Sequence, residues 1–215
     1  MAYRACIFDL DGVITDTAHY HYLAWQQLAQ SLGLDFNEGD NDRLKGVGRM
    51  ESLNYILAKS PRAFSDGDKV ALAHQKNEHY KTLIKGITPS DILPGITEAF
   101  SWLKNAGWKI GLASASRNAP QVINSLSIAD VFDYVADTGA IPHGKPAPDI
   151  FLNVAAAFEL EADVCIGVED AAVGVTAIKA AGMTAVGIGD PDILAKADVV
   201  MPTPEGLKEF LVMQA

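Results

Sequence analysis

Charged and polar side chains follow several short apolar segments of this sequence of 215 residues. Asp9 and Asp11 come directly after the first segment, Ser114 follows another, and the pair Glu169–Asp170 follows a third. Lys145 lies in a loop between the last two. Carboxylates can bind a hard cation or act as nucleophiles, and a lysine and hydroxyl groups can hold an anion. These residue types indicate one polar site if the fold brings the segments together.

The elements that must position these residues are short predicted strands that alternate with helices. Each strand is an apolar run, as expected of strands buried on both faces of a sheet. The alternation predicts an α/β fold with a doubly wound, Rossmann-like parallel sheet, in which ligands bind beyond the carboxyl ends of the strands. The predicted strands cover residues 3–8, 109–113, 134–136, 164–168, 184–188 and 198–201. The helices that alternate with them are predicted to begin near residues 96, 120, 149, 171 and 204.

A helix-rich stretch separates the first predicted strand from the others. Trp25, Leu28 and Leu32 share one helix face, and Gly33 can end that helix. Further helices are predicted to begin near residue 49 and at residue 65 or 66, and no strand pattern occurs between residues 17 and 88. We therefore expect a core domain of residues 1–15 and 92–215 and an inserted helical cap domain of residues 16–91. The cap would be a lid hinged near residues 15–17 and 91–94.

Composition limits the classes of partner. Hydrophobic residues make up 49% of the chain, enough for a folded core, and the net charge of −10 disfavours nucleic acid and anionic membranes as partners. No apolar run is long enough for a membrane span, and the start of the chain lacks the features of a signal peptide. Cys6 and Cys165 lie in apolar runs typical of buried thiols. We expect a cytoplasmic monomer, in which any phosphate site needs local cations or a metal.

Four segments resemble the motifs of the haloacid dehalogenase superfamily. Residues 8–13 are similar to the first motif, Ser114 to the second, Lys145 to the third, and residues 167–170 to the fourth. A single pair of aspartates two residues apart would be a weak signal. Together the motifs are a specific signal, because they occur in the family order and each lies at or just beyond a predicted strand end. The resemblance covers the whole chain.

This resemblance implies a magnesium-dependent phosphotransferase in which Asp9 is the nucleophile and becomes phosphorylated. Asp11 would act as general acid and base. Mg²⁺ would be held by Asp9, the backbone carbonyl of Asp11, Asp170 and Glu169. Lys145 would neutralise the transferring phosphoryl group. The alternatives are a solvated loop lysine at position 145 and, for the last acidic pair, a favourable interaction with a helix dipole.

Longer segments resemble the β-phosphoglucomutases within this superfamily; they include residues 11–18, 44–49, 113–116 and 145–151. The resemblance implies a mutase that interconverts β-D-glucose 1-phosphate and D-glucose 6-phosphate. The reaction would pass through an aspartyl phosphate and a β-D-glucose 1,6-bisphosphate intermediate, which would also prime the enzyme. The expected partner is therefore a small-molecule sugar phosphate.

The same resemblance implies a second phosphate site and a sugar pocket between core and cap. Arg49 from the cap would meet the core segment 116–118, where Arg117 replaces a lysine that is common in these mutases. Trp25 could instead be a core residue, and Lys76 lies in a polar run typical of a solvated face. The residues assigned to substrate binding are Thr17, His21, Trp25, Lys45, Gly46, Arg49, Ser52, Lys76, Ser114, Ala115, Ser116, Arg117, Asn118 and Lys145.

Two other functions stay open at this point. A sugar-phosphate phosphatase would share the fold and the Asp9 chemistry, because only the cap and its exclusion of water separate the two enzymes. The segments 45–49 and 116–118, which would supply the second phosphate site, favour the mutase. A non-catalytic sugar-phosphate sensor is the third hypothesis, and the intact set of nucleophile, acid/base group and metal ligands disfavours it.

Overall fold

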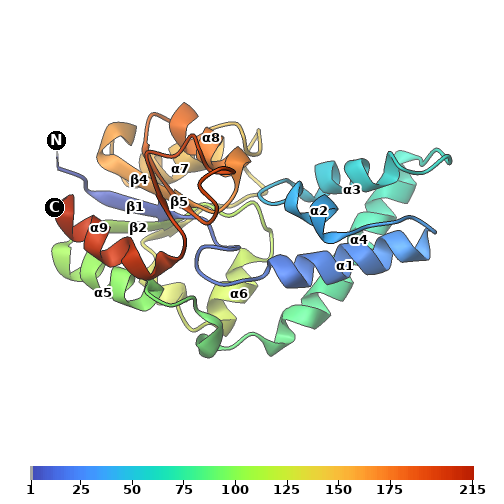
Figure 1. The fold of residues 1–215 in the computed structure, drawn as a ribbon, viewed down its shortest axis with the longest axis horizontal. Coiled ribbons are helices and arrows are strands. Elements are labelled where there is room, and N and C mark those ends of the chain that lie inside the picture. Colours follow the sequence, from blue (N-terminus) through green and yellow to red (C-terminus); the bar gives the residue numbers. More distant parts are fainter. Residues whose placement is uncertain (1) are drawn as a thin grey trace.

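The computed structural model describes residues 2–215 and contains one six-stranded sheet (Figure 1). Its order is β3-β2-β1-β4-β5-β6, and every neighbouring pair is parallel. The first strand is therefore central, which is the doubly wound arrangement that the alternating pattern predicted. The strands are β1 Ala5–Phe8, β2 Lys109–Leu112, β3 Tyr134–Val135, β4 Cys165–Glu169, β5 Thr184–Ile188 and β6 Val199–Met201.

The sheet is buried on both faces, which explains why its strands are apolar throughout. Cys6 and Phe8 of β1 belong to one apolar core, and Ala5 and Ile7 belong to the other, because successive side chains of a strand point to opposite faces. Cys6 and Cys165 are buried free thiols in different cores. The first core contains α5 Ile96–Ala106, α6 Ala119–Ser125 and α9 Leu207–Met213, and the second contains α7 Asp149–Ala157 and α8 Ala172–Ala180.

The strand register brings the carboxyl ends of β1, β2 and β4 to one edge. Phe8 at the end of β1 pairs with Leu112 of β2 and with Val168 of β4. Beyond these pairs, the backbone N–H of Asp9 donates to the carbonyl of Val168 at 2.9 Å, and that of Ala113 donates to the carbonyl of Phe8 at 2.8 Å. The polar segments that follow these strands therefore leave the sheet side by side.

Between β1 and β2 the chain forms a group of helices to one side of the sheet (Figure 1). We call residues 16–91 the cap and the other described residues the core. The cap has an apolar core of its own, which includes Trp25, Leu28, Leu53 and Ile56. The helices of the cap are α1 Ala18–Ser31, α2 Glu38–Asp42, α3 Arg49–Leu57 and α4 Asp66–Leu83, and the part of the cap after α4 forms short 3-10 segments.

Capping boxes determine where two of the cap helices begin. Ser65 Oγ accepts the N–H of Asp68 at 3.1 Å, and the Asp68 carboxylate accepts the N–H of Ser65 at 3.0 Å, which confirms the predicted start of α4. Asn37 and Asp40 form the same arrangement at α2. Helix α2 was not predicted, because a helix of five residues is too short to show an apolar period.

The two connections between cap and core run side by side. Thr15 forms a bridge with Ile92, and its Oγ1 donates to the carbonyl of Asp91 at 2.8 Å. The N–H of Leu93 donates to the carbonyl of Ile14, also at 2.8 Å. These are the segments in which the sequence analysis placed a hinge. A rotation there would move the cap as one unit.

Short 3-10 helices complete the described chain. None of the helices within residues 2–215 is long and apolar enough to cross a membrane. The 3-10 segments join the longer elements to one another. They are Ile84–Gly86, Pro89–Asp91, Ala129–Val131, Ala162–Val164 and Pro204–Gly206.

Candidate active site

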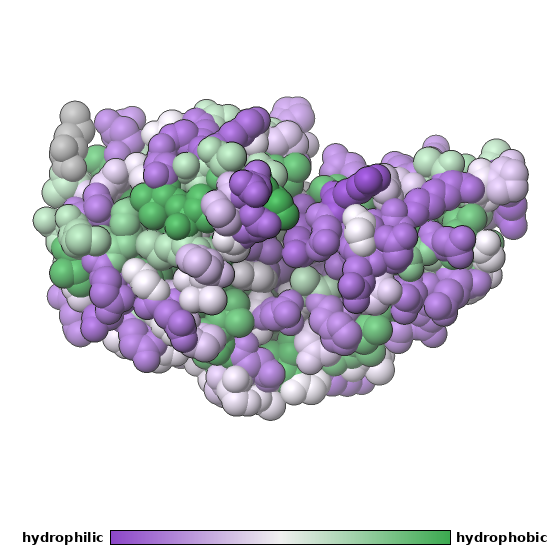
Figure 2. Space-filling model, viewed as in Figure 1, coloured by the Kyte–Doolittle hydropathy of each residue, from purple (hydrophilic) through white to green (hydrophobic). Residues whose placement is uncertain are grey.

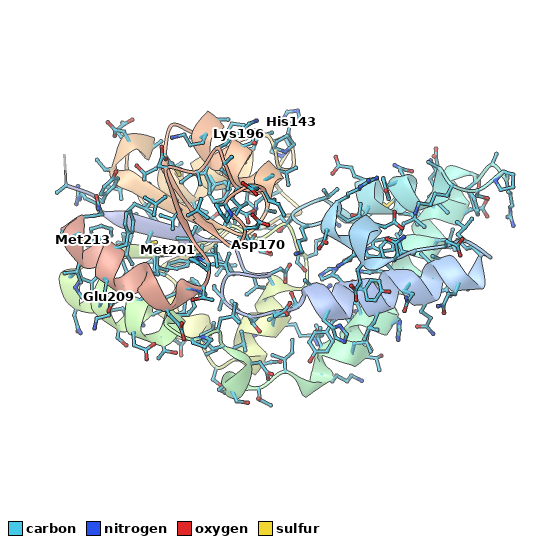
Figure 3. All side chains as sticks on the ribbon, viewed as in Figure 1. His143, Asp170, Lys196, Met201, Glu209 and Met213 are labelled. Carbon is cyan, nitrogen blue, oxygen red and sulfur yellow. The ribbon has the colours of Figure 1, made fainter. Side chains whose placement is uncertain are left out.

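A cavity of about 650 Å³ lies between core and cap, beyond the carboxyl edge of the sheet. Figure 2 shows the surface hollowed where the two parts meet, and Figure 3 places Asp170 at the edge of the core that faces the cap. Most residues assigned from the sequence line this cavity: Asp9, Asp11, His21, Trp25, Lys45, Gly46, Arg49, Ser52, Lys76, Ala115, Ser116, Arg117, Asn118, Lys145 and Asp170. Thr17, Ser114 and Glu169 contact these wall residues from behind.

Asp9 is buried, and both of its carboxylate oxygens accept hydrogen bonds. Lys145 Nζ donates to Asp9 Oδ1 at 2.7 Å and to Glu169 Oε1 at 2.8 Å, and the backbone N–H of Asp11 donates to Asp9 Oδ2 at 3.1 Å. Lys145 is 4% exposed, so the alternative of a solvated loop lysine is wrong. These bonds hold the Asp9 carboxylate in one orientation with a positive charge beside it.

Glu169 fixes this arrangement from behind the cavity wall. It is fully buried, and its Oε2 accepts the backbone N–H of Asp170 at 2.7 Å and that of Ala171 at 3.2 Å. A Cβ atom at Gly174 would overlap the Glu169 carboxylate, so the glycine leaves the space that this side chain occupies. Gly174 was not predictable from the sequence, because nothing in a helical glycine indicates which side chain packs on it.

The acidic residues form a group that fits a divalent cation. Carboxylate oxygens of Asp9, Glu169 and Asp170 lie within 4.8 Å of one another. Burial and the neighbouring carboxylates raise the pKa of Asp170 well above its ordinary value, and burial, opposed by Lys145, raises the pKa of Asp9 to about 7. Among the described residues, Lys145 is the ammonium group that pairs with these carboxylates, so the group has more negative than positive charge. Oxygen donors with excess negative charge are what Mg²⁺ prefers.

Asp11 uses its carboxylate oxygens differently from Asp9. Thr17 Oγ1 donates to Asp11 Oδ1, and His21 Nε2 lies 4.0 Å from Asp11 Oδ2. Burial raises the pKa of Asp11, although the Thr17 hydrogen bond and Lys145 act in the opposite direction. A carboxyl group with a raised pKa can bind and release a proton closer to neutral pH, as a general acid and base must.

Lys76 is buried, so the alternative of a solvated face is wrong at this residue. It is 3% exposed, and its Nζ lies 4.5 Å from the centre of the Trp25 ring and 2.9 Å from His21 Nδ1. Burial and Arg49 lower the pKa of Lys76 to about 7, and burial, Lys76 and Arg49 lower that of His21 well below its ordinary value. A neutral His21 that accepts at Nδ1 carries its proton on Nε2, which faces Asp11. Trp25 belongs to both the cap core and the cavity wall.

Two arginines from different parts of the chain line the same cavity. Arg49 begins α3 in the cap, and Arg117 lies in the core loop between β2 and α6. Burial and the nearby Arg117 guanidinium lower the pKa of Arg49. In the core loop, the N–H of Ser116 donates to Ser114 Oγ at 3.1 Å, and that of Asn118 donates to Ser116 Oγ at 3.2 Å. Two guanidinium groups beside an ordered loop can hold an anion.

Gly46 lets a loop of the cap approach the core closely. Its φ is +71°, and a Cβ atom there would lie 2.9 Å from Val173 Cγ2 and 3.2 Å from Ala171 Cβ. A glycine is therefore required both for the backbone conformation and for the short approach. The neighbouring Lys45 pairs with Asp42 at 3.1 Å on the surface of the cap.

Two polar residues that no motif indicated also belong to the site. Asn77 Oδ1 accepts a hydrogen bond from Asn118 Nδ2 at 2.9 Å, and both side chains are buried. Thr138 Oγ1 donates to the carbonyl of Ser114 at 2.8 Å, and Thr138 lines the cavity. The sequence carries no signal for either, because Asn77 lies in a polar run and Thr138 in a loop.

This arrangement defines a class of protein: a buried aspartate beyond the central strand of a parallel sheet, paired with a lysine, next to an acidic group and under a cap inserted after that strand. The model of the haloacid dehalogenase-like hydrolase family matches residues 3–182. The chain belongs to this family, as its motifs predicted.

Within the family, the chain is similar to β-phosphoglucomutases. It is 46% identical over 200 residues to the β-phosphoglucomutase of Bacillus subtilis (strain 168). The aligned region covers 92% of this chain and 88% of that protein. The crystal structure of a β-phosphoglucomutase from Clostridium difficile superposes with a TM-score of 0.95 at 46% identity, over 99% of this chain and 96% of that one. A fructose-1-phosphate phosphatase of Escherichia coli (strain K12) is 32% identical over 187 residues, 86% of this chain and 96% of that one.

Proposed function

We propose that this chain is a β-phosphoglucomutase that interconverts β-D-glucose 1-phosphate and D-glucose 6-phosphate. The observation that carries the proposal is a single cavity with two sets of groups for phosphate. One set is Asp9 with Lys145, and the other is Arg49 with Arg117. A phosphatase has to bind one phosphate, whereas a sugar bisphosphate intermediate requires two sites. The 46% identity to a β-phosphoglucomutase supports the same activity.

Asp9 is the proposed nucleophile. Its carboxylate is held by Lys145 and by the N–H of Asp11, so little motion is needed before it attacks phosphorus. Asp9, Glu169, Asp170 and the carbonyl of Asp11 would hold Mg²⁺, which when bound reduces the repulsion between the carboxylate and a phosphate dianion. Lys145 places its ammonium group beside the same reaction centre and stabilises charge on the transferring group.

Asp11 is the proposed general acid and base. In the closed cavity its carboxyl group would give a proton to the leaving oxygen or take one from the attacking sugar hydroxyl. The hydrogen bond from Thr17 orients the group from the cap side, and His21 Nε2 lies 4.0 Å from its other oxygen. Because both come from the cap, the acid/base group is fully arranged when the cap lies over the core.

The second phosphate set explains how one site can act on two positions of a sugar. While phosphorylated Asp9 donates to one hydroxyl, Arg49 and Arg117 with the loop 116–118 would hold the phosphate already on the sugar. The resulting β-D-glucose 1,6-bisphosphate then reorients, so that its other phosphate faces Asp9. Asp9 takes back that phosphoryl group. Trace bisphosphate would therefore prime the enzyme, and water must stay out of the cavity while Asp9 is phosphorylated.

An NMR time course of β-D-glucose 1-phosphate with Mg²⁺ and a trace of the bisphosphate tests this function. We expect D-glucose 6-phosphate to appear with little inorganic phosphate, and we expect Asp9→Asn to abolish the conversion. Asp35→Asn makes the same substitution at an exposed position of the cap and should leave the rate unchanged. Release of inorganic phosphate as fast as the sugar is consumed would instead favour a phosphatase, such as the 32% identical relative from Escherichia coli.

A further inference from the structure

The side chain of Asn77 joins the cap to the core at a place that the mechanism above does not use. Asn77 lies on α4 of the cap, and Asn118 ends the core loop that leads into α6. Their side-chain amides are hydrogen-bonded at 2.9 Å, and the two residues are 9% and 8% exposed. Within residues 2–215 no other side-chain hydrogen bond connects α4 to the core.

Asn118 is part of the proposed second phosphate set, so its partner influences that set directly. Its backbone N–H donates to Ser116 Oγ, and the N–H of Ser116 donates to Ser114 Oγ. The loop that carries Arg117 is therefore held by hydrogen bonds that link Asn118 to Ser116 and Ser116 to Ser114. A cap residue that holds Asn118 also fixes how the cap lies relative to this loop.

Charge in the same region opposes closure. Arg49 of the cap and Arg117 of the core are close enough for Arg117 to lower the pKa of Arg49, and neither forms an ion pair with a carboxylate in the described part of the chain. Until a phosphate lies between them, the two guanidinium groups repel. At this end of the cavity, the Asn77–Asn118 bond joins the cap to the core without charge and so acts against the repulsion between the two arginines.

We propose that Asn77 is a positioning residue that fastens the closed cap to the second phosphate loop and so favours transfer to sugar over transfer to water. The inference rests on the proposed mutase function. A neutral amide suits this place, because a cation would add to the repulsion and an anion would compete with the phosphate. When a sugar phosphate neutralises the arginines, the Asn77–Asn118 hydrogen bond stabilises the same closed state that the phosphate favours. The cap therefore stays closed during transfer.

The size of the effect follows from the strength of one neutral hydrogen bond. Its loss should lower the ratio of closed to open cap about 2- to 10-fold. We expect Asn77→Leu, which keeps the volume and removes the bond, to raise the ratio of phosphate release to isomer formation by a similar factor. KM for the sugar phosphate should rise more than kcat falls, because closure mainly adds to binding.

The test uses full-length protein and compares three variants by two measurements. The first measurement is the ratio of inorganic phosphate to D-glucose 6-phosphate formed from β-D-glucose 1-phosphate. The second is the radius of gyration from small-angle X-ray scattering without ligand, which needs no activity. Asn77→Leu should raise both values. Asn77→Asp keeps an acceptor oxygen for Asn118 and should stay as compact as the wild type. Gln75→Leu changes an exposed amide on the same helix and should change neither value.

The possible outcomes separate this inference from the proposed function. A wild type that forms no D-glucose 6-phosphate would contradict the proposed function. The scattering comparison would still test whether Asn77 holds the cap against the core. Asn77→Leu with wild-type compactness and a wild-type product ratio would overturn the inference. So would a loss of activity in Asn77→Leu with an unchanged ratio and KM, because that result describes general destabilisation.

Discussion

At the scale of single residues, the site depends on how charge is balanced around Asp9. Lys145 lies between Asp9 and Glu169 with contacts of 2.7 and 2.8 Å, and all three side chains are buried. Burial raises the pKa of Asp9, and Lys145 is the main group that lowers it. The same lysine therefore favours the ionised nucleophile, and it would stabilise the phosphoryl group that the nucleophile receives.

Replacing Lys145 should affect both of these roles. We expect Lys145→Met to lower kcat by about 10²- to 10³-fold, the loss typical of one preorganised charge or donor. The pKa of Asp9 should rise further above its value of about 7, because the group that lowers it is gone. The acidic limb of the kcat/KM profile should then move to higher pH. Lys196→Met, at an exposed lysine of the core, is the control, and an unmoved acidic limb would argue against the charge-balance account.

The role of Asp11 can be tested by the leaving group of the phosphate donor. Asp11→Asn should slow phosphoryl transfer between Asp9 and sugar oxygens by about 10²- to 10⁴-fold, because an alkoxide leaves poorly without a proton. Acetyl phosphate has a carboxylate leaving group that needs no proton, so phosphorylation of Asp9 from it should be nearly unaffected. The two rates can be compared by mass spectrometry and NMR. An equal loss with both donors would assign Asp11 to the metal site alone.

At the scale of elements, the cap and core meet through loops that approach closely. Gly46 combines a φ of +71° with a short approach to Val173 and Ala171 of the core. Any side chain there must push the cap away from the acidic group or strain the backbone. The side chains of the loop 45–49 can therefore contact the site, and the missing side chain at Gly46 lets the loop come close to the core.

A pair of glycine substitutions separates these two effects. Gly33 has a similar φ of +69° at the end of α1, but nothing lies within 4 Å of a Cβ atom there. Gly33→Ala and Gly46→Ala should each lose about 1 kcal/mol of stability from the left-handed conformation. Only Gly46→Ala should also raise KM, because only there does the methyl group meet the core. Thermal unfolding and steady-state kinetics measure the two quantities, and an equal KM in both variants would contradict the steric account.

The same elements show what the sequence could predict. The strands and the residues beyond them were predictable, because buried parallel strands are apolar and their register must bring Asp9, Ser114 and Glu169 to one edge. The polar face of α4 was not. Lys76 and Asn77 are buried only because other parts of the fold cover them, and a helix with polar residues on all sides gives no period from which to infer this. Similarly, no local pattern indicates that Gly174 makes room for Glu169.

At the scale of the whole molecule, the acidic group makes stability depend on pH and metal. Asp9 and Asp170 have pKa values raised by burial, so the folded chain binds their protons more tightly than the unfolded chain does. Stability from such carboxyl groups is fully present below their ordinary pKa of 3.8, and it is lost as pH rises through the folded value, about 7 for Asp9. These carboxyl groups therefore favour the folded state least in the pH range where they are ionised and ready to act.

Mg²⁺ should reverse this loss, because a cation that binds the ionised carboxylates binds the folded chain alone. In the presence of a chelator, we expect the Tm of the wild type to fall between roughly pH 4 and pH 8, with Asp9 alone accounting for on the order of 4 kcal/mol over that range. Asp170→Asn removes one of the repelling groups, so this variant should lose less Tm over the same range. Mg²⁺ at pH 8 should raise the Tm of the wild type more than that of the variant.

Asp192→Asn is the matched control, since it makes the same substitution at an exposed position of the core and should follow the wild type at every pH. Differential scanning calorimetry with chelator and with Mg²⁺ gives all the required values. Other titrating groups contribute equally to the three proteins, so the difference between Asp170→Asn and the wild type isolates the acidic group. If that difference were the same at pH 5 and pH 8, the carboxylates would not repel one another in the fold, and the need for a cation would lose its electrostatic basis.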